Sequence, residues 1–174
     1  MTSTWPAHGT TRPAQDTTAP AQDTTGIVAG RCPATATAWA TPDPPPGFAR
    51  PGPRLAGPLV PIAARYMVLC RYNGMNERPY RRLRAARLVA GAADVRRWRA
   101  RFNDLPAIPP GPRSCPFDDD RRLLIAFVAS PRSSVVLSAT VAGCGYVSDG
   151  VQLRDLASAP DWRFRDDLLR LAGG

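Results

Sequence analysis

Three residue types that often carry catalysis are nearly missing from this chain of 174 residues. Lysine is absent, since all 23 residues that are Lys or Arg are arginines. His8 is the single histidine, and Glu77 is the single glutamate. A Ser-His-Asp triad, a Cys-His pair and a zinc site with histidine ligands all need a histidine inside a folded site. Because the one histidine lies near the N-terminus, the sequence predicts no catalytic residue. We expect a protein that is not an enzyme.

Several motifs are also lacking. No run of 18 apolar residues occurs, so no transmembrane helix is expected. There is no glycine-rich phosphate loop and no CxxC spacing, which disfavours a nucleotide cofactor and a structural zinc site. The acidic cluster at 118–120 lacks the alternating ligands and the glycine of a calcium loop, and Arg121 and Arg122 follow it directly. Asp149 would lie near this cluster only if the predicted strands pair in one assumed register. We predict no cofactor and no metal site.

Residues 1–64 have the composition of a disordered segment. They contain 12 of the 20 prolines and two copies of Pro-Ala-Gln-Asp-Thr-Thr, at 13–18 and 20–25. Such a composition buries too little apolar surface to offset the loss of chain entropy. The prolines within 42–46 favour a stiff, extended spacer. We predict a disordered tail and linker rich in proline, threonine and alanine.

Residues 65–174 have the composition of a single folded domain. Residues 66–72 are rich in strand-favouring side chains and end at an Asn-Gly turn signal. Residues 123–129 and 135–141 are apolar and flank a short polar segment, a pattern typical of an antiparallel hairpin. Residues 143–147 are expected to continue or bend the second strand of that hairpin.

One segment has clear helical periodicity. Apolar residues recur at spacings of three and four, Asp94 is expected as the N-cap, and Pro106 ends the helix. Its buried face is expected to contain Val95, Trp98, Phe102 and Leu105. A second helix is predicted over residues 161–171, burying Trp162, Leu168, Leu169 and Leu171. The predicted fold class is α+β, a small antiparallel sheet with one or two covering helices.

Residues 79–90 allow two interpretations. As a helix, the segment would have Asn76 as its cap, Pro79 in its first turn and Gly91 just past its end. As a strand, it would alternate between its two faces. One face would carry Leu83, Ala85 and Val89, and the other Arg82, Arg84 and Leu88. The sequence alone leaves both open.

The four cysteines allow three disulfide pairings. If the hairpin turns at residues 131–132, Cys144 lies opposite about Asp119, which is four residues from Cys115. A Cys115–Cys144 disulfide, closing a loop of about 30 residues, is therefore predicted. The rival pairing is Cys70–Cys144, between neighbouring strands. The alternative to both is free, buried cysteines that behave as small apolar residues.

The tail and the cysteines together suggest a location. A Thr/Pro-rich tail and disulfides fit an extracytoplasmic or envelope-associated protein. Residues 1–30 show neither a basic nor an apolar leader segment. Arg31 directly before Cys32 also breaks the pattern of a lipoprotein cleavage site. Our hypothesis is a misplaced start codon or a lost signal, and the alternative is a cytoplasmic location.

Four segments carry a resemblance to a known group of proteins. They are VLCRYNG at 68–74, Leu105-Pro106 before a Pro/Gly loop, CPFD at 115–118, and Gly143-Cys144 leading to VSDG at 147–150. Together they resemble uncharacterised small secreted or lipoprotein-like proteins of high-GC actinomycetes, in which a signal or lipoprotein leader precedes the proline-rich spacer. The resemblance covers about half the chain. It implies a compartment and a domain boundary, but no activity and no site residue.

The net charge of +9 is concentrated in one segment. Residues 65–113 contain twelve arginines and three acidic residues, whereas 1–64 have a net charge of +1 and 114–174 of −1. The lack of lysine fits a GC-rich genome and says little about partners. The predicted partner is an anionic surface or polymer, such as lipid head groups or a wall polymer; the alternative is a solvated basic face. The candidate binding residues are Arg81, Arg82, Arg84, Arg87, Arg97 and Arg101.

The leading hypothesis is therefore a non-enzymatic, extracytoplasmic binding module with a basic surface. The alternative is a cytoplasmic nucleic-acid-associated protein that uses the arginine-rich segment 78–101, although no recognised nucleic-acid motif accompanies it.

Overall fold

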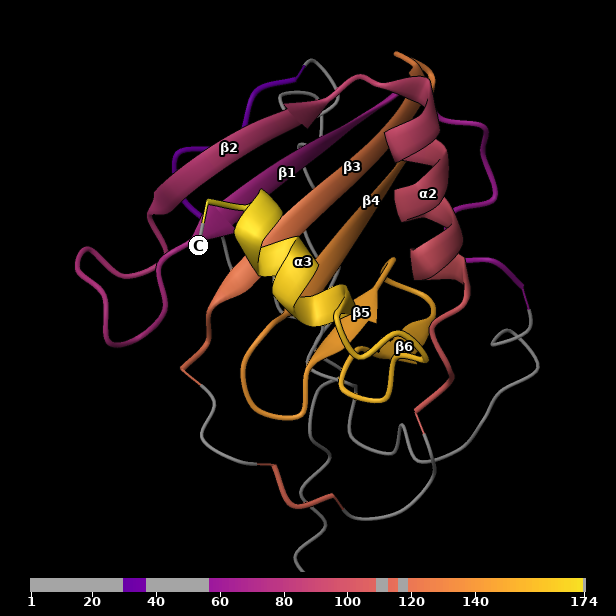
Figure 1. Cartoon of the computed structure of the whole chain (residues 1–174). Helices are drawn as coiled ribbons and strands as arrows, with labels where there is room; N and C mark the ends of the chain where they lie inside the picture. Colours follow the sequence, from indigo (N-terminus) through magenta and orange to yellow (C-terminus); the bar gives the residue numbers. More distant parts are fainter. Residues whose placement is uncertain (1–29, 37–56, 109–112, 116–118, 174) are drawn as a thin grey trace, which may run out of the picture.

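The computed structural model describes residues 30–36, 57–108, 113–115 and 119–173. They form one six-stranded antiparallel sheet with two helices against one of its faces (Figure 1), which confirms the predicted α+β class. The elements are β1 (Tyr66–Tyr72), β2 (Leu83–Val89), α2 (Ala92–Asn103), β3 (Arg122–Ser130), β4 (Ser133–Thr140), β5 (Tyr146–Ser148), β6 (Leu153–Asp155) and α3 (Phe164–Leu171). The order across the sheet is β2-β1-β3-β4-β5-β6, so β2 and β6 are its edges. Most of the expected tail lies outside the described residues.

The central strands β1 and β3 are buried on both faces for most of their length. Their nearly continuous apolar sequences are typical of such strands. The strand expected at 66–72 is confirmed, and so is the hairpin. β3 pairs with β4 from Arg122↔Thr140 to Ser130↔Ser133.

Residues 83–89 form a strand, so the helical interpretation of this segment is wrong. β2 pairs antiparallel with β1, and the register shifts between Arg71 and Tyr72. The extra residue on β2 is Arg84, which makes a β-bulge. As a result Leu83 packs on one face of the sheet and Val89 on the other. The expected grouping of these two side chains is wrong, because simple alternation does not survive a bulge.

After β4 the chain reverses direction. Gly143 and Gly145 have φ angles of 62° and 57°, which residues with a side chain rarely adopt. β5 then runs antiparallel to β4, with Ser138 opposite Ser148. Of the two expectations for residues 143–147, continuation of the second hairpin strand is wrong, because the two glycines allow the chain to turn back tightly.

Helix α2 buries the face that its periodicity predicts. Trp98 and Phe102 are buried against the sheet, and Phe102 meets Phe127 of β3 edge to face, with 5.6 Å between ring centres. The N-cap residue is Gly91, not Asp94 as expected. Asp94 lies in the first turn instead, where its negative charge interacts favourably with the helix dipole.

Helix α3 begins later than expected. Phe164 and Leu168 are buried, whereas Trp162 precedes the helix and is 74% exposed. The predicted burial of Trp162 is wrong, because the chain turns Phe164 towards the core in its place. The Phe164 ring lies 5.0 Å from that of Phe102 on α2.

Two segments of the expected tail pack onto the domain. Leu59 and Val60 are buried in the core on the helix side of the sheet. The Asn103 side chain of α2 bonds both the N–H and the C=O of Val60, at 2.7 and 3.2 Å. Residues 30–36 contact the opposite face of the sheet, where Figure 1 shows them behind β1 and β2. Side chains that precede residue 65 in sequence thus pack against both faces of the sheet.

Both disulfides link distant parts of the chain. Cys115 and Cys144 are bonded, with 4.8 Å between their Cα atoms, which confirms the predicted pair. The rival Cys70–Cys144 pairing is wrong, because Cys70 is bonded to Cys32 with 5.6 Å between Cα atoms. None of the four cysteines is free.

Candidate functional site

The six candidate arginines do not form one patch. Arg81 and Arg101 belong to ion-pair networks, and Arg97 pairs with Asp94 on its own helix. The other three lie on β2 or directly before it. They are Arg82, Arg84 and Arg87.

Arg81 joins the start of β2 to the segment before β3. Its Nη2 atom lies 3.3 Å from Oδ2 of Asp120. The same oxygen accepts a hydrogen bond from the Tyr80 hydroxyl, and Oδ1 accepts one from the Arg122 guanidinium. Burial alone raises the pKa of Asp120, but these donors outweigh it and hold the pKa below its usual value of 3.8. Arg81 and Asp120 both have positive φ angles, 58° and 56°. The arginine therefore has a structural role at this end of the sheet.

Arg101 connects α2 to α3. Its guanidinium lies 2.7 Å from Asp161 and 2.9 Å from Asp167, and 4.8 Å from the centre of the Trp98 ring. The side chain is only 16% exposed. Hydrogen bonds from Arg101, and then from Arg170, hold the pKa of Asp167 below its usual value. Arg101 is therefore engaged within the protein rather than open to a partner.

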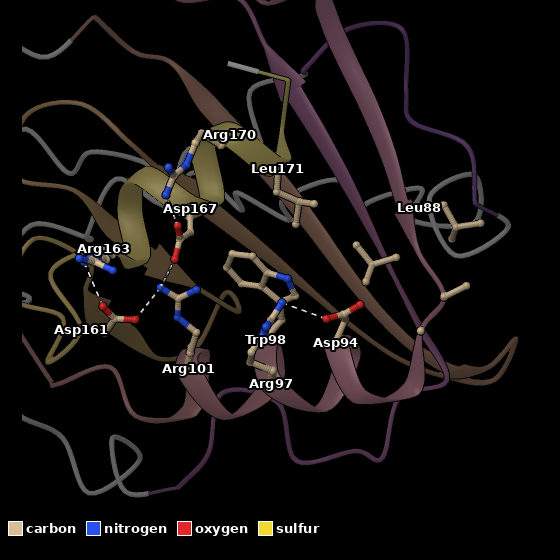
Figure 2. A pocket seen from close by; sticks show the side chains of 13 residues that line it. Leu88, Asp94, Arg97, Trp98, Arg101, Asp161, Arg163, Asp167, Arg170 and Leu171 are labelled. Carbon is tan, nitrogen blue, oxygen red and sulfur yellow. Dashed lines mark hydrogen bonds and ion pairs between the residues drawn. The ribbon is translucent and has the colours of Figure 1, made fainter.

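A groove of about 1120 Å³ surrounds Arg101, between the end of β2, α2 and α3 (Figure 2). Charged side chains of both signs line it. They are Arg97, Arg101, Arg163, Arg170, Asp94, Asp161 and Asp167. In Figure 2 dashed lines join Arg101 of α2 to Asp161 and Asp167, whereas Arg97 pairs with Asp94 of its own helix. Because the opposite charges nearly cancel, the groove lacks the positive excess that an anionic partner needs.

The positive excess lies on β2 instead. Arg82, Arg84 and Arg87 are exposed, and none of them forms an ion pair with a described residue. The strand itself contains no acidic residue. Arg71 of the neighbouring strand adds a fourth guanidinium nearby and donates to the carbonyl of Gly173 at 3.1 Å. This edge of the sheet is the part of the predicted basic site that the structure leaves accessible.

Within the acidic cluster, Asp120 meets the distant Arg81, whereas Asp119 makes a local ion pair. Asp118 lies outside the described residues, and Asp119 pairs with Arg121. Asp149 accepts hydrogen bonds at 2.8 and 2.6 Å from the N–H groups two and three residues ahead, within its own turn. It therefore does not join the cluster. Among the described residues, no group of three or more His, Cys, Asp or Glu side chains is placed to hold a metal ion.

Comparisons with family models, with curated proteins and with solved structures gave no match. The site is therefore argued from geometry and charge. Neither helix in the described part of the chain has the length and apolar character that a membrane crossing requires.

The acidic partners of Arg81 and Arg101 were not identified from the sequence. Asp120 is 39 residues from Arg81, and Asp161 is 60 residues from Arg101. No local spacing indicates such pairs. The Arg97–Asp94 pair, at three residues on one helix, is of the kind that spacing does indicate.

Proposed function

We propose that this protein is a non-enzymatic, extracytoplasmic binding module whose β2 arginines bind an anionic surface or polymer. The observation that carries the proposal is the charge of β2. Arg82, Arg84 and Arg87 are exposed and form no ion pair with a described residue. A cluster of uncompensated positive charges attracts anions and increases their local concentration.

The cysteines support the extracytoplasmic part of the proposal. All four are paired in two disulfides. Structural disulfides persist in oxidising compartments and are rare in the cytosol of most cells. Fractionation of the native host tests this part: recovery in the envelope or medium is expected, whereas cytoplasmic protein with four free thiols would overturn it.

Nucleic acid is the second candidate partner, through segment 78–101. The ion pairs of Arg81, Arg97 and Arg101 weigh against it, since they divide the basic segment into separate parts. Phosphate contacts of a nucleic acid would need several neighbouring, uncompensated cations. We therefore rank it below an extracytoplasmic polyanion.

The proposal is tested by binding to immobilised heparin and to vesicles of anionic and neutral lipid. We expect binding to the anionic probes that falls steeply between about 50 and 200 mM salt, because counterion release drives it. Substituting Arg82, Arg84 and Arg87 together by glutamine should weaken binding at low salt by about tenfold or more.

A matched variant distinguishes the effect of the β2 arginines from the effect of the protein's net charge. Substituting the exposed Arg96, Arg132 and Arg163 by glutamine removes the same charge elsewhere on the surface. This control should lose much less affinity than the β2 variant. Equal losses in the two variants, or no retention of the unaltered protein at low salt, would overturn the proposal. Preference for duplex DNA over heparin and vesicles would favour the second candidate.

A further inference from the structure

Resting on the proposed function, we infer that the anionic polymer is an acidic polypeptide in extended conformation. It binds as an added strand along the outer edge of β2. The inference combines the open edge of the sheet, its demonstrated capacity to pair, and its charge.

The outer edge of β2 is accessible over most of its length. β2 is the terminal strand of the sheet, and Arg84, Ala86, Arg87 and Leu88 are all exposed. Leu88 is 63% exposed and adds an apolar side chain to this edge. Within the described residues, the one bridge to this edge is Thr35↔Arg82, at its very start.

That bridge shows that the edge can pair with a further strand. The N–H of Leu83 donates to the carbonyl of Ala34 at 2.9 Å, and the N–H of Ala36 donates to the carbonyl of Arg81 at 2.8 Å. These are the hydrogen bonds of an antiparallel ladder. At its start, before the bulge at Arg84, the edge therefore directs backbone groups outward, where they bind a partner strand.

The chain's own segment leaves the edge for a physical reason. Ala34 and Ala36 direct their backbone groups towards β2, so the alternation of an extended chain turns those of Pro33 away from it. The Pro33 carbonyl accepts a hydrogen bond from the Tyr72 hydroxyl at 3.1 Å, under the face of β1. Cys32 is tied to Cys70 on the same face. The segment thus lies beneath the sheet, and no described residue pairs with the edge from Arg84 to Val89.

Charge decides which strand fits this edge. Arg84 and Arg87 lie on the open part, and the strand has no acidic residue. A second copy of this chain, paired antiparallel about Ala85 and Ala86, would place Arg84 of one molecule against Arg87 of the other. Like charges directly opposed destabilise a strand pair, whereas acidic side chains there stabilise it.

The backbone groups favour a polypeptide over other polyanions. A peptide in extended form offers N–H and C=O groups at the spacing of a strand, so it gains main-chain hydrogen bonds as well as charge contacts. A polysaccharide, a nucleic acid or a lipid surface would gain the charge contacts alone.

The experiment uses the full, oxidised protein and synthetic peptides of alternating glutamate and valine, matching the seven residues of β2 in length. One peptide is unmodified, and one is N-methylated at every residue, which keeps its charge but removes its donors. Calorimetry should show the methylated peptide binding at least about tenfold more weakly, because strand addition needs main-chain hydrogen bonds. Backbone NMR should show amides of β2 shifting and gaining exchange protection with the unmodified peptide.

The outcomes separate this inference from the proposed function. Equal affinity for the two peptides, or shifts centred on Arg97 and Arg163 of the groove, would overturn strand addition while heparin binding through β2 still stood. A protein that binds heparin and neither peptide would also overturn strand addition. Failure to bind any anionic probe would overturn both.

Discussion

Cys32 is bonded to Cys70 in the middle of β1, across 38 residues of sequence and with 5.6 Å between the two Cα atoms. The bond holds residues 30–36 against the sheet face opposite the helices, where Ala36 is buried. It also limits the length over which this segment pairs with the edge of β2. The disulfide therefore affects both the burial of one sheet face and the exposure of the basic edge.

The two disulfides should be the only cysteine connections found. Peptide mapping under non-reducing conditions is expected to recover Cys32–Cys70 and Cys115–Cys144. Replacing either pair by serine should lower the free energy of unfolding by about 3 to 4 kcal/mol, because each bond closes a loop of roughly 30 to 40 residues. Denaturant titration measures the loss, and a recovered Cys70–Cys144 peptide would contradict the arrangement.

Asp120→Asn should destabilise the protein in a pH-dependent way. The hydrogen bonds that oppose its burial keep the pKa of Asp120 below 3.8 in the folded state, so its carboxylate stabilises the fold above that pH. At neutral pH we expect a loss of about 2 kcal/mol. The difference from the unaltered protein should shrink as the pH falls below 3.8, where the carboxylate is protonated first in the unfolded chain. Urea titrations at neutral pH and at about pH 3 measure this.

Tyr80→Phe is the matched variant for that experiment. It removes one donor to Asp120 while Arg81 and Arg122 remain. Its effect at neutral pH should be smaller than that of Asp120→Asn. A loss in Asp120→Asn that is the same at both pH values would show that the carboxylate charge is not what stabilises this corner.

Phe102→Ala and Trp162→Ala should differ widely in their effects. Phe102 is fully buried and meets both Phe127 and Phe164 edge to face, so its truncation should cost about 3 to 5 kcal/mol. Trp162 is 74% exposed, so its truncation should change stability by less than about 0.5 kcal/mol. Thermal unfolding followed by circular dichroism compares the two. A large loss in Trp162→Ala would place that ring in the core after all.

Arg101→Gln should destabilise the protein more than Arg97→Gln. Arg101 is 16% exposed, pairs with two aspartates and lies over the Trp98 and Phe164 rings, so a loss of about 1 to 2 kcal/mol is expected. Arg97 is 66% exposed and pairs only with Asp94 on its own helix, so a loss of about 0.3 kcal/mol is expected. Denaturant titration of both variants at low and high salt tests this. Equal losses would contradict the role of Arg101 in connecting α2 to α3.

Features that depend on neighbours in sequence were predictable. The face of α2 follows from the spacing of Val95, Trp98 and Phe102, and the β3–β4 hairpin follows from two apolar runs around a turn. The Cys115–Cys144 pair follows from the register of that hairpin. Each of these depends on local periodicity, because side chains repeat about every 3.6 residues in a helix and every two in a strand.

Features that depend on distant contacts were not predictable. The bulge at Arg84 separates Leu83 from Val89, and no residue in the sequence marks it. Phe164, not Trp162, fills the space beside Phe102, because the start of α3 depends on packing rather than on periodicity. Residues 57–64 have the composition of a linker, yet side chains among them pack in the core on the helix side of the sheet.

The amino-acid order alone predicts an α+β domain with a basic segment, because composition and short-range periodicity carry that information. The tertiary structure decides which arginines remain accessible. Arg81 and Arg101 meet aspartates 39 to 66 residues away and become structural, whereas Arg82, Arg84 and Arg87 meet none among the described residues. Charge pairing acts through space, and only the fold brings these side chains within reach of one another.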